Sequence, residues 1–349
     1  MSKLYIWRAA SVVQETSDTI TIRFNTGNEY FLYKAGQFVN LTILIDGNPV
    51  TRSYSLSSVP GLDAAPSITV KKIQGGLMSS YIVDHYTSID HWQVEGPYGS
   101  FTPPSQCSQV VILTAGSGIT PVYPIAVSVL RSQLAARVTI IYSNRTAGSI
   151  IFRKQLEQLK ERFGERVNII HVLSQDGEQL LHGCDELITG RLNRIILKKL
   201  IKKYVDTPAS AHYFICGPSL LIKLHQDCLQ SLTVPTGNIY EEWYHPEATA
   251  AAIELPTQMH EVMFHFYEQS NLLEVQPGSN ILHTALQERI AVPNSCNNGT
   301  CGKCAAKLTS GNIVMKQNYV LRKEELEAGL VLLCQSYPLN SDVTVEIGS

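Results

Sequence analysis

Near its C-terminal end the chain reads Cys296-Asn297-Asn298-Gly299-Thr300-Cys301-Gly302-Lys303-Cys304, and a fourth cysteine, Cys334, follows later. The spacing is C-x4-C-x2-C-x29-C. Three thiolates on one tight loop can surround one side of a small iron–sulfur cluster, and a distant fourth thiolate closes it. Gly299 and Gly302 let backbone N–H groups approach the sulfurs closely. The spacing therefore predicts a plant-type 2Fe–2S cluster with four ligands: Cys296, Cys301, Cys304 and Cys334.

Zinc and disulfides are the alternative interpretations of these cysteines. Structural zinc sites of this kind usually pair two C-x2-C units, and the chain has one such unit. The remaining cysteines, Cys107, Cys184, Cys216 and Cys228, are scattered over a long stretch. Clustered cysteines in a cytoplasmic chain favour a metal or redox centre over structural bridges.

The composition limits the classes of function. The 349 residues suggest two or three domains. A net charge of −2 argues against nucleic acid as the main partner, because phosphate binding needs a basic face. No apolar run is long enough for a membrane span, and the first residues do not resemble a secretory signal. We therefore expect a cytoplasmic protein that binds neither nucleic acid nor membranes, and the sequence leaves its oligomeric state open.

Four segments differ in their patterns. Residues 1–104 contain short runs rich in Val, Ile, Thr, Phe and Tyr between turn signals, which predicts an all-β barrel. Residues 105–244 alternate apolar strands with helix-like stretches, which predicts an α/β domain with a parallel sheet. Residues 245–256 are small and weakly patterned, as in a linker. Residues 257–349 begin with a strand-like run and include the cysteine cluster.

In the second segment, continuous apolar runs mark strands that are buried on both faces. We expect strands at 110–114, 138–142, 167–173 and 212–218, with helices at 125–134 and 152–163.

The first segment carries Arg52-Ser53-Tyr54-Ser55 after a strand-like run. Arginine can hold a pyrophosphate, and tyrosine offers a flat face to an isoalloxazine ring. A second loop, Gly75-Gly76-Leu77-Met78-Ser79, offers backbone amides that can take phosphate oxygens. Gly36-Gln37-Phe38 lies upstream and Gly96-Pro97-Tyr98-Gly99-Ser100-Phe101 closes the region.

This order of motifs resembles the ferredoxin–NADP reductase superfamily over residues 1 to about 245, and the last segment resembles a plant-type ferredoxin with an α+β β-grasp fold. The resemblance implies an FAD-binding barrel in which Arg52, Ser53, Tyr54 and Ser55 contact the flavin, with Gly76, Met78 and Ser79 on its phosphates. FMN is the competing flavin, because phthalate dioxygenase reductases have the same domain order and use it. The glycine loop favours FAD.

A nicotinamide site is expected in the second segment. Gly116-Ser117-Gly118-Ile119-Thr120-Pro121 follows a buried strand, where glycines let a pyrophosphate approach a helix N-terminus. Its pattern G-x-G-x-T-P resembles the nicotinamide-binding loop of the superfamily, which implies roles for Gly116, Gly118, Thr120 and Pro121. By the same resemblance Cys216, Gly217 and Pro218 line the nicotinamide pocket, and Glu242 and Tyr244 lie near the open face of the flavin.

The choice between NADPH and NADH depends on the turn after the second strand. This turn reads Ser143-Asn144-Arg145-Thr146 and has no carboxylate. Ser143 and Arg145 can bind a 2′-phosphate, so the sequence favours NADPH while NADH stays open.

Together the three sites imply an NAD(P)H-dependent reductase that passes electrons through FAD and the 2Fe–2S cluster to a partner, with no acid–base catalyst. The domain order, flavin then nicotinamide then ferredoxin, resembles reductase components of phenylacetyl-CoA epoxidases, which implies a multicomponent oxygenase as the electron acceptor and a role in phenylacetate catabolism. Related reductases serve steroid hydroxylases and hybrid-cluster proteins. A redox sensor without turnover and a reductase of free flavin are the alternatives.

Overall fold

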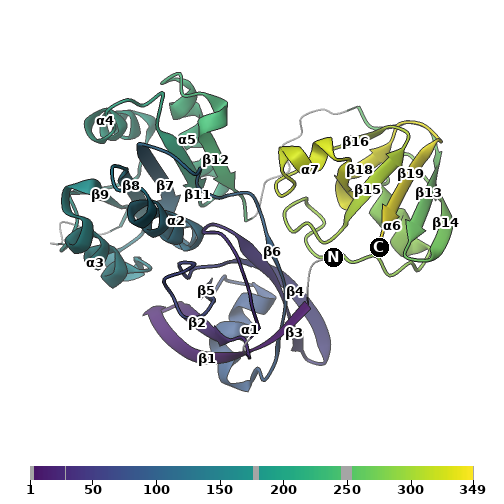
Figure 1. Ribbon diagram of the computed structural model, residues 1–349, viewed down its shortest axis with the longest axis horizontal. Coiled ribbons are helices and arrows are strands. Elements are labelled where there is room, and N and C mark those ends of the chain that lie inside the picture. Colours follow the sequence, from purple (N-terminus) through teal and green to yellow (C-terminus); the bar gives the residue numbers. More distant parts are fainter. Residues whose placement is uncertain (1–3, 28, 176–180, 245–253, 349) are drawn as a thin grey trace.

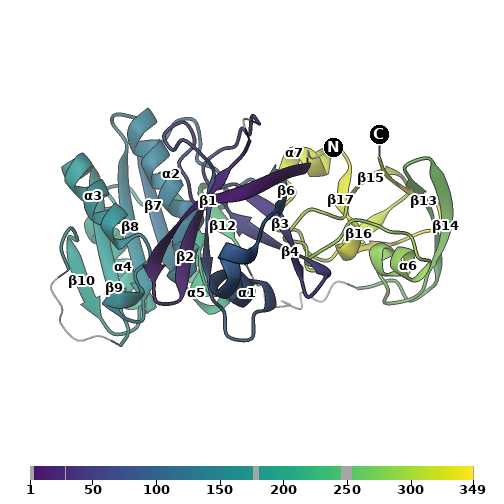
Figure 2. The same ribbon diagram turned by 90° about the horizontal axis from the view of Figure 1, so that it is seen from below.

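The computed structural model describes residues 4–27, 29–175, 181–244 and 254–348. Its strands form three separate main sheets, one for each predicted domain. Both views place the N-terminal sheet between the other two, with the central segment on one side and the C-terminal segment on the other (Figures 1 and 2). The N-terminal domain therefore contacts both the central domain and the C-terminal domain.

The N-terminal sheet is antiparallel, in the order β4-β3-β6-β1-β2-β5. A bridge between Leu56 and Ile68 brings its two edges together, so the sheet curls into a barrel. Trp7, Phe24 and Trp92 are fully buried inside it. The elements are β1 (Leu4–Thr16), β2 (Thr19–Asn25), β3 (Phe38–Ile45), β4 (Asn48–Ser55), β5 (Ser67–Lys71), α1 (Leu77–His85), η1 (Tyr86–Ser88) and β6 (Trp92–Tyr98).

The central sheet is wholly parallel, in the order β10-β9-β8-β7-β11-β12. The chain leaves β7 toward β8 and later returns to β11 on the other side, so a crevice opens at the carboxyl ends of β7 and β11. The strands are β7 (Gln109–Ala115), β8 (Arg137–Asn144), β9 (Val167–Leu173), β10 (Glu186–Thr189), β11 (His212–Cys216) and β12 (Ile239–Glu242). The helices are η2 (Gly116–Gly118), α2 (Ile119–Ser132), η3 (Ala147–Ser149), α3 (Arg153–Phe163), η4 (Gly164–Arg166), α4 (Arg194–Tyr204), α5 (Ser219–Gln230) and η5 (Thr236–Asn238).

The C-terminal sheet is mixed, in the order β14-β13-β19-β15-β17, with β13 and β19 parallel. Ile281, Leu282 and Ala285 on α6 are buried in its core. Such a mixed sheet with a helix across it has the architecture of a β-grasp. The elements are β13 (His260–Phe266), β14 (Gln269–Val275), α6 (Ile281–Gln287), β15 (Ala305–Ser310), β16 (Ile313–Met315), α7 (Lys323–Glu327), β17 (Leu330–Leu332), η6 (Leu333–Gln335), β18 (Ser336–Pro338) and β19 (Val343–Ile347).

The predicted linker, 245–256, lies largely outside the described residues, because the description resumes at residue 254. Among the residues that are described, no helix is long and apolar enough to cross a membrane.

Candidate electron-transfer site

Four side chains from three distant segments meet where the barrel touches the central domain. The Ser55 hydroxyl at the end of β4 donates to Glu242 Oε1 at 2.6 Å. The same hydroxyl lies 3.1 Å from the Tyr244 hydroxyl, which lies 2.8 Å from Thr120 Oγ1. The structure thus brings together one predicted flavin residue, one residue of the nicotinamide loop, Glu242 at the end of β12 and Tyr244 just beyond it.

The predicted nicotinamide loop lies at the crevice between β7 and β11. Gly118 approaches β11 so closely that a Cβ atom there would lie 2.2 Å from the Cys216 carbonyl oxygen, so any larger residue would displace the strand. Thr114 Oγ1 donates to the same carbonyl at 2.9 Å. Thr120 and Pro121 form the first turn of α2, and Pro218 precedes α5. The site loops and the two strands are therefore held as one unit.

Burial changes the titration of this group of side chains. It raises the pKa of Glu242 to about 7, against a smaller opposing effect of the Ser55 hydrogen bond. It also raises the pKa of Cys216 well above the usual value, and the nearby Glu242 carboxyl adds to that effect. The Cys216 thiol is therefore neutral at ordinary pH. With a pKa of about 7, the Glu242 carboxyl can carry or release a proton near neutral pH.

The residues expected to hold the flavin have surroundings that suit a flavin. Burial raises the pKa of Tyr54, opposed by the positive charge of Arg52. Arg52 itself is exposed, so its guanidinium can reach a phosphate. The N-terminus of α1 follows Gly76 and has no side-chain cap, which leaves its first amides for phosphate oxygens.

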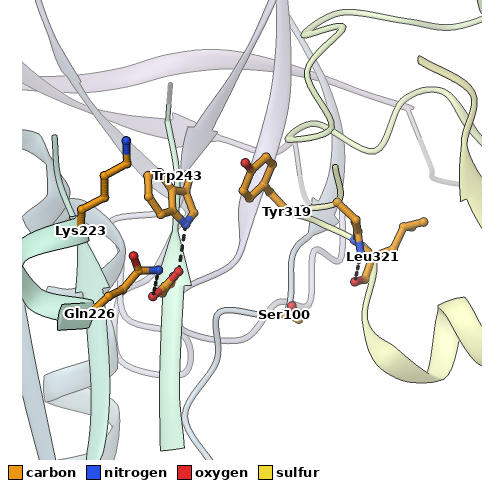
Figure 3. Close-up of a pocket in the computed structure, with 8 residues that line it drawn as sticks. Ser100, Lys223, Gln226, Trp243, Tyr319 and Leu321 are labelled. Atoms are coloured by element: carbon orange, nitrogen blue, oxygen red, sulfur yellow. Dashed lines mark hydrogen bonds between the residues drawn. The ribbon is translucent and has the colours of Figure 1, made fainter. Parts of the chain in front are cut away.

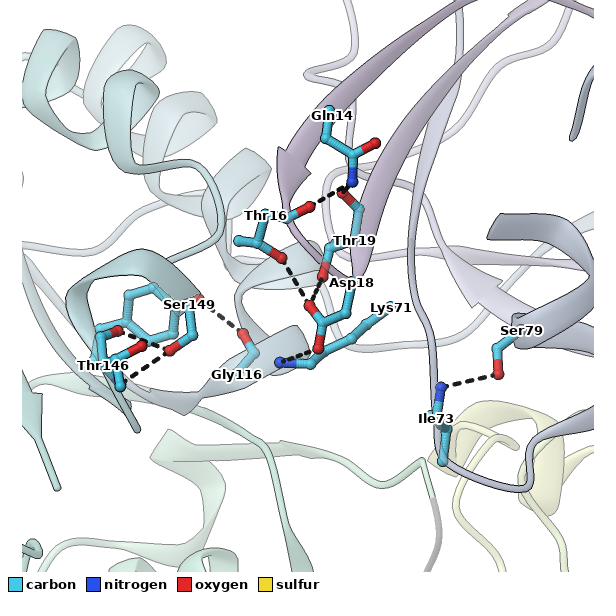
Figure 4. A network of polar contacts seen from close by, with 11 residues as sticks. Gln14, Thr16, Asp18, Thr19, Lys71, Ile73, Ser79, Gly116, Thr146 and Ser149 are labelled. Carbon is cyan, nitrogen blue, oxygen red and sulfur yellow. Dashed lines mark hydrogen bonds and ion pairs between the residues drawn. The ribbon is translucent and has the colours of Figure 1, made fainter. Parts of the chain in front are cut away.

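Two of the expected phosphate contacts have side chains engaged elsewhere. Met78 is packed into the barrel core, so its backbone amide is the group available to a phosphate. The Ser79 hydroxyl accepts a hydrogen bond from the Ile73 amide at 3.2 Å and so ties the loop to the helix (Figure 4).

At the carboxyl end of β8, the Ser143 hydroxyl is buried and has no hydrogen-bond partner in the described part of the chain. Arg145 is exposed beside it. The Gly116 carbonyl accepts a hydrogen bond of 2.8 Å from the Tyr142 hydroxyl, which connects β8 to the glycine loop (Figure 4). A hydroxyl without a partner next to an exposed guanidinium fits the 2′-phosphate of a nucleotide.

The four cysteines of the predicted cluster converge. The Cys296 sulfur lies within hydrogen-bonding reach of the Cys301 and Cys334 thiols, and Cys334 lies within reach of Cys304. These donors hold the pKa of Cys296 below its ordinary value. The amides of Thr300 and Cys301 both point at the Cys296 sulfur, at 3.3 Å each. Four free thiols facing one another, with amides directed at a sulfur, fit a 2Fe–2S cluster.

The sequence motifs did not reveal the residues that join the domains. Asn40 on β3 donates to the Cys301 carbonyl at 3.1 Å, and Lys303 pairs with Glu95 on β6 at 3.1 Å. Neither Asn40 nor Glu95 belongs to a recognisable motif, and each lies more than two hundred residues from its partner in the chain. The sole available signal was a polar residue within the apolar run of β3.

A cavity of about 460 Å³ lies between the central domain and the C-terminal domain. Trp243 lines one side and Tyr319 the other, with their ring centroids 6.0 Å apart (Figure 3). Glu241 holds Trp243 in place by accepting from its Nε1 at 3.1 Å and from Gln226 at 2.7 Å. The Tyr319 amide donates to the Gly299 carbonyl, so this wall of the cavity is joined to the cysteine loop.

Family models match all three domains. Residues 8–102 match an oxidoreductase FAD-binding domain, residues 112–227 match an oxidoreductase NAD-binding domain, and residues 266–339 match a 2Fe–2S iron–sulfur cluster binding domain. The expected multidomain fold and the expected cofactors, FAD, a nicotinamide dinucleotide and a 2Fe–2S cluster, are confirmed. The protein is therefore an NAD(P)H-dependent oxidoreductase.

Relatives with the same domains extend along the whole chain. One component of the 1,2-phenylacetyl-CoA epoxidase of Escherichia coli is 30% identical over 99% of this chain and 98% of its own length. The ferredoxin reductase component of the 3-ketosteroid-9-alpha-monooxygenase of Rhodococcus rhodochrous is 31% identical over 99% and 97%. A solved phthalate dioxygenase reductase has the same fold, with a TM-score of 0.59 at 20% identity over 99% of this chain and 98% of that chain. The chain thus belongs to the ferredoxin–NADP reductase superfamily, in the group that carries its 2Fe–2S ferredoxin domain at the C-terminal end.

Proposed function

We propose that this protein is the reductase component of a multicomponent oxygenase in the cytoplasm, of the phenylacetyl-CoA epoxidase type. It takes electrons from NADPH and delivers them singly to a partner oxygenase. The observation that carries this proposal is the arrangement of two sites on one barrel. The Ser55–Glu242–Tyr244 group lies on the side of the central domain, and the cysteine loop lies on the side of the ferredoxin domain.

When bound, FAD accepts electrons in pairs and releases them singly, and the cluster carries one electron at a time. The protein supplies position and surroundings. Arg52, Tyr54 and the N-terminus of α1 hold the flavin, and the Gly116–Pro121 loop brings the nicotinamide to it. Glu242 and Tyr244 close the site, and Cys216 forms its buried floor. Cys296, Cys301, Cys304 and Cys334 hold the cluster.

A preference for NADPH over NADH rests on the end of β8. It lacks the carboxylate that would bind the ribose hydroxyls of NADH, and it offers the Ser143 hydroxyl and the Arg145 guanidinium instead. We expect Arg145→Asp to lower kcat/KM for NADPH roughly tenfold, as for loss of a charge-assisted contact, and to leave NADH nearly unaffected. Initial rates with both nucleotides measure the ratio. The neighbouring Arg153→Asp, in the ion pair with Glu157, is the control.

The partner is tested by reconstitution. Purified protein, NADPH and the oxygenase subunits of a phenylacetyl-CoA epoxidase should together consume oxygen in proportion to phenylacetyl-CoA. The oxygenase of a 3-ketosteroid-9-alpha-monooxygenase is the comparison, because the Rhodococcus relative serves as its reductase. Faster turnover with the steroid oxygenase would assign the protein to that acceptor class.

The enzyme interpretation itself has a simpler test against the two alternatives. The holoenzyme with NADPH or NADH should reduce cytochrome c, and Cys301→Ser should abolish this transfer while the flavin is still reduced. A redox sensor would not turn over cytochrome c at all. A reductase of free flavin would keep its full activity in Cys301→Ser.

A further inference from the structure

Strand β3 is buried on both faces near its start. A strand of an isolated barrel would have one face toward solvent. Val39 and Leu41 point into the barrel core and are fully buried. The alternate residues Phe38 and Asn40 point outward, yet they are 7% and 1% exposed. Phe38 packs into the hydrophobic cluster of the ferredoxin domain. The outer face of β3 is therefore covered by that domain.

Asn40 is the middle residue of a polar row that crosses three strands. It is the register partner of Ser53 on β4 and of Glu95 on β6. Residues directly opposite one another in an antiparallel sheet project from the same face. Ser53, Asn40 and Glu95 thus form a row, here called the docking row, that faces the ferredoxin domain.

Each residue of the docking row has a polar partner. Asn40 Nδ2 donates to the Cys301 carbonyl at 3.1 Å, and Asn40 Oδ1 accepts from Ser53 Oγ at 2.7 Å. Lys303 pairs with Glu95 at 3.1 Å, with only 10% of the lysine side chain exposed. Further along the flavin strand, the Thr51 carbonyl accepts from Ser295 Oγ at 3.1 Å. Hydrogen bonds therefore join the flavin-binding strand to the peptide of a cluster ligand.

We propose that the docking row holds the cluster loop in the position where it receives electrons from the flavin, with Asn40 as the positioning residue and Lys303–Glu95 as the charge pair that selects this arrangement. The amide of Asn40 suits this role because it satisfies Ser53 and Cys301 at once, and its bond to the Cys301 carbonyl is buried. Glu95 gives the buried ammonium of Lys303 its counter-charge. Separating the two charges while they remain buried is therefore costly.

The inference deepens the proposed function and rests on its electron path. Each docking event moves one electron: the two-electron-reduced flavin loses it, and the cluster gains it as one ferric ion becomes ferrous. The second electron can follow only after the cluster has passed the first to the acceptor. The docking row affects the first of these transfers and has no part in reduction of the flavin by NADPH.

The first test changes Asn40 to Asp in the holoenzyme. The aspartate still accepts from Ser53 but presents an oxygen to the Cys301 carbonyl, so the docked arrangement should lose roughly tenfold in population.

For the measurement, oxidised holoenzyme is mixed with excess NADPH without oxygen. Flavin absorbance gives the first phase, and rapid-freeze EPR of the reduced cluster gives the second. We expect the first phase unchanged and the second slowed roughly tenfold. Equal second phases would overturn the proposal.

The second test reverses charges, and it holds even if Asn40→Asp fails to bind its cluster. Glu95→Lys and Lys303→Glu should each slow the second phase, and the double variant should recover most of the rate. Recovery separates docking from a change in cluster potential, because Lys303→Glu remains next to the cluster in the double variant. Asp84→Lys, which breaks the exposed Lys72–Asp84 pair of the same barrel, is the control and should leave both phases unchanged. A double variant as slow as the single ones would refute the pairing.

Failure of this inference differs from failure of the proposed function. Neither test contains an oxygenase, so the second phase reports docking alone. Normal cluster reduction without turnover by any tested oxygenase would remove the proposed partner and leave the docking row intact.

Discussion

Glu242 combines burial and chemistry in a single residue. Its carboxyl lies against the Ser55 hydroxyl, between the barrel and the central domain, and burial raises its pKa to about 7. Below this pH the carboxyl is neutral, and above it the carboxyl is an anion in the site proposed for the flavin. An anion at this position opposes the build-up of negative charge there.

We therefore expect the rate of flavin reduction by NADPH to fall as the pH rises through about 7. Glu242→Gln should keep the low-pH rate at every pH, because the amide stays neutral. Stopped-flow measurements between pH 5.5 and about 8.5 check both profiles, in a range centred on the raised pKa. Glu241→Gln, on the adjacent residue that faces the cavity, should retain the pH dependence of the parent protein. The same fall in Glu242→Gln would assign the titration to another group.

Individual residues differ in how far the sequence could predict them. The cysteine spacing predicts four ligands because a metal cluster imposes a fixed local pattern, and each of the four thiols lies within hydrogen-bonding reach of another of the set. The roles proposed for Ser143 and Arg145 remain predictions. Asn40 could not be identified, because its function depends on a pairing register with Ser53 and Glu95 and on a domain that follows two hundred residues later. Such contacts have no local sequence signal.

At the scale of elements, the buried strands of the central domain were predicted nearly to the residue, since runs such as 110–114 and 167–173 have no other stable environment in a folded chain. The predicted start of helix α2 was wrong. It begins at Ile119, not at residue 125, and includes Pro121 and Pro124. Pro121 lies in the first turn, where no intrahelical donor is needed. The short strand β10 and the helix α4 were not predicted.

Helix α5 contains a buried histidine, and its lowered pKa predicts a loss of stability in acid. His225 is 1% exposed, and neither ring nitrogen has a hydrogen-bond partner within the described residues. Burial lowers its pKa from 6.5 to about 3. The unfolded chain binds a proton below pH 6.5 that the folded chain refuses, so this group contributes stability above pH 6.5 that is lost as the pH falls toward 3.

We expect His225→Leu to reduce the acid sensitivity of unfolding. In the parent protein this single group should lower the free energy of unfolding by about 1.4 kcal/mol for each pH unit below its unfolded pKa. Urea unfolding of the holoenzyme at pH 7 and at about pH 5, followed by helical circular dichroism, measures the difference. His283→Leu, on the exposed side of α6, is the matched control. An unchanged slope in His225→Leu would show that His225 is hydrated or paired in solution.

On the scale of the whole molecule, the barrel lies between two domains that depend on it to different degrees (Figure 2). Its contact with the central domain includes part of the chemical site, through Ser55, Glu242 and Tyr244. Its contact with the ferredoxin domain includes Phe38 and Tyr98, the docking row and the Ser295–Thr51 hydrogen bond. Loss of the ferredoxin domain should therefore leave the first half of the electron path intact.

A chain that ends at residue 329 tests this division. It lacks Cys334 and the strands β17, β18 and β19, and because β19 pairs with both β13 and β15 the ferredoxin sheet cannot form. We expect no iron in the purified product, but normal FAD content and flavin reduction at the parent rate. Exposure of Phe38 removes about 2 kcal/mol of burial, so the melting temperature of the remaining domains should fall by roughly 5 °C. Phe38→Ser in the truncated chain should cost little more, whereas the same change in the full chain should weaken docking. Loss of flavin from the truncated chain would contradict this division and would mean that the ferredoxin domain helps to hold the flavin.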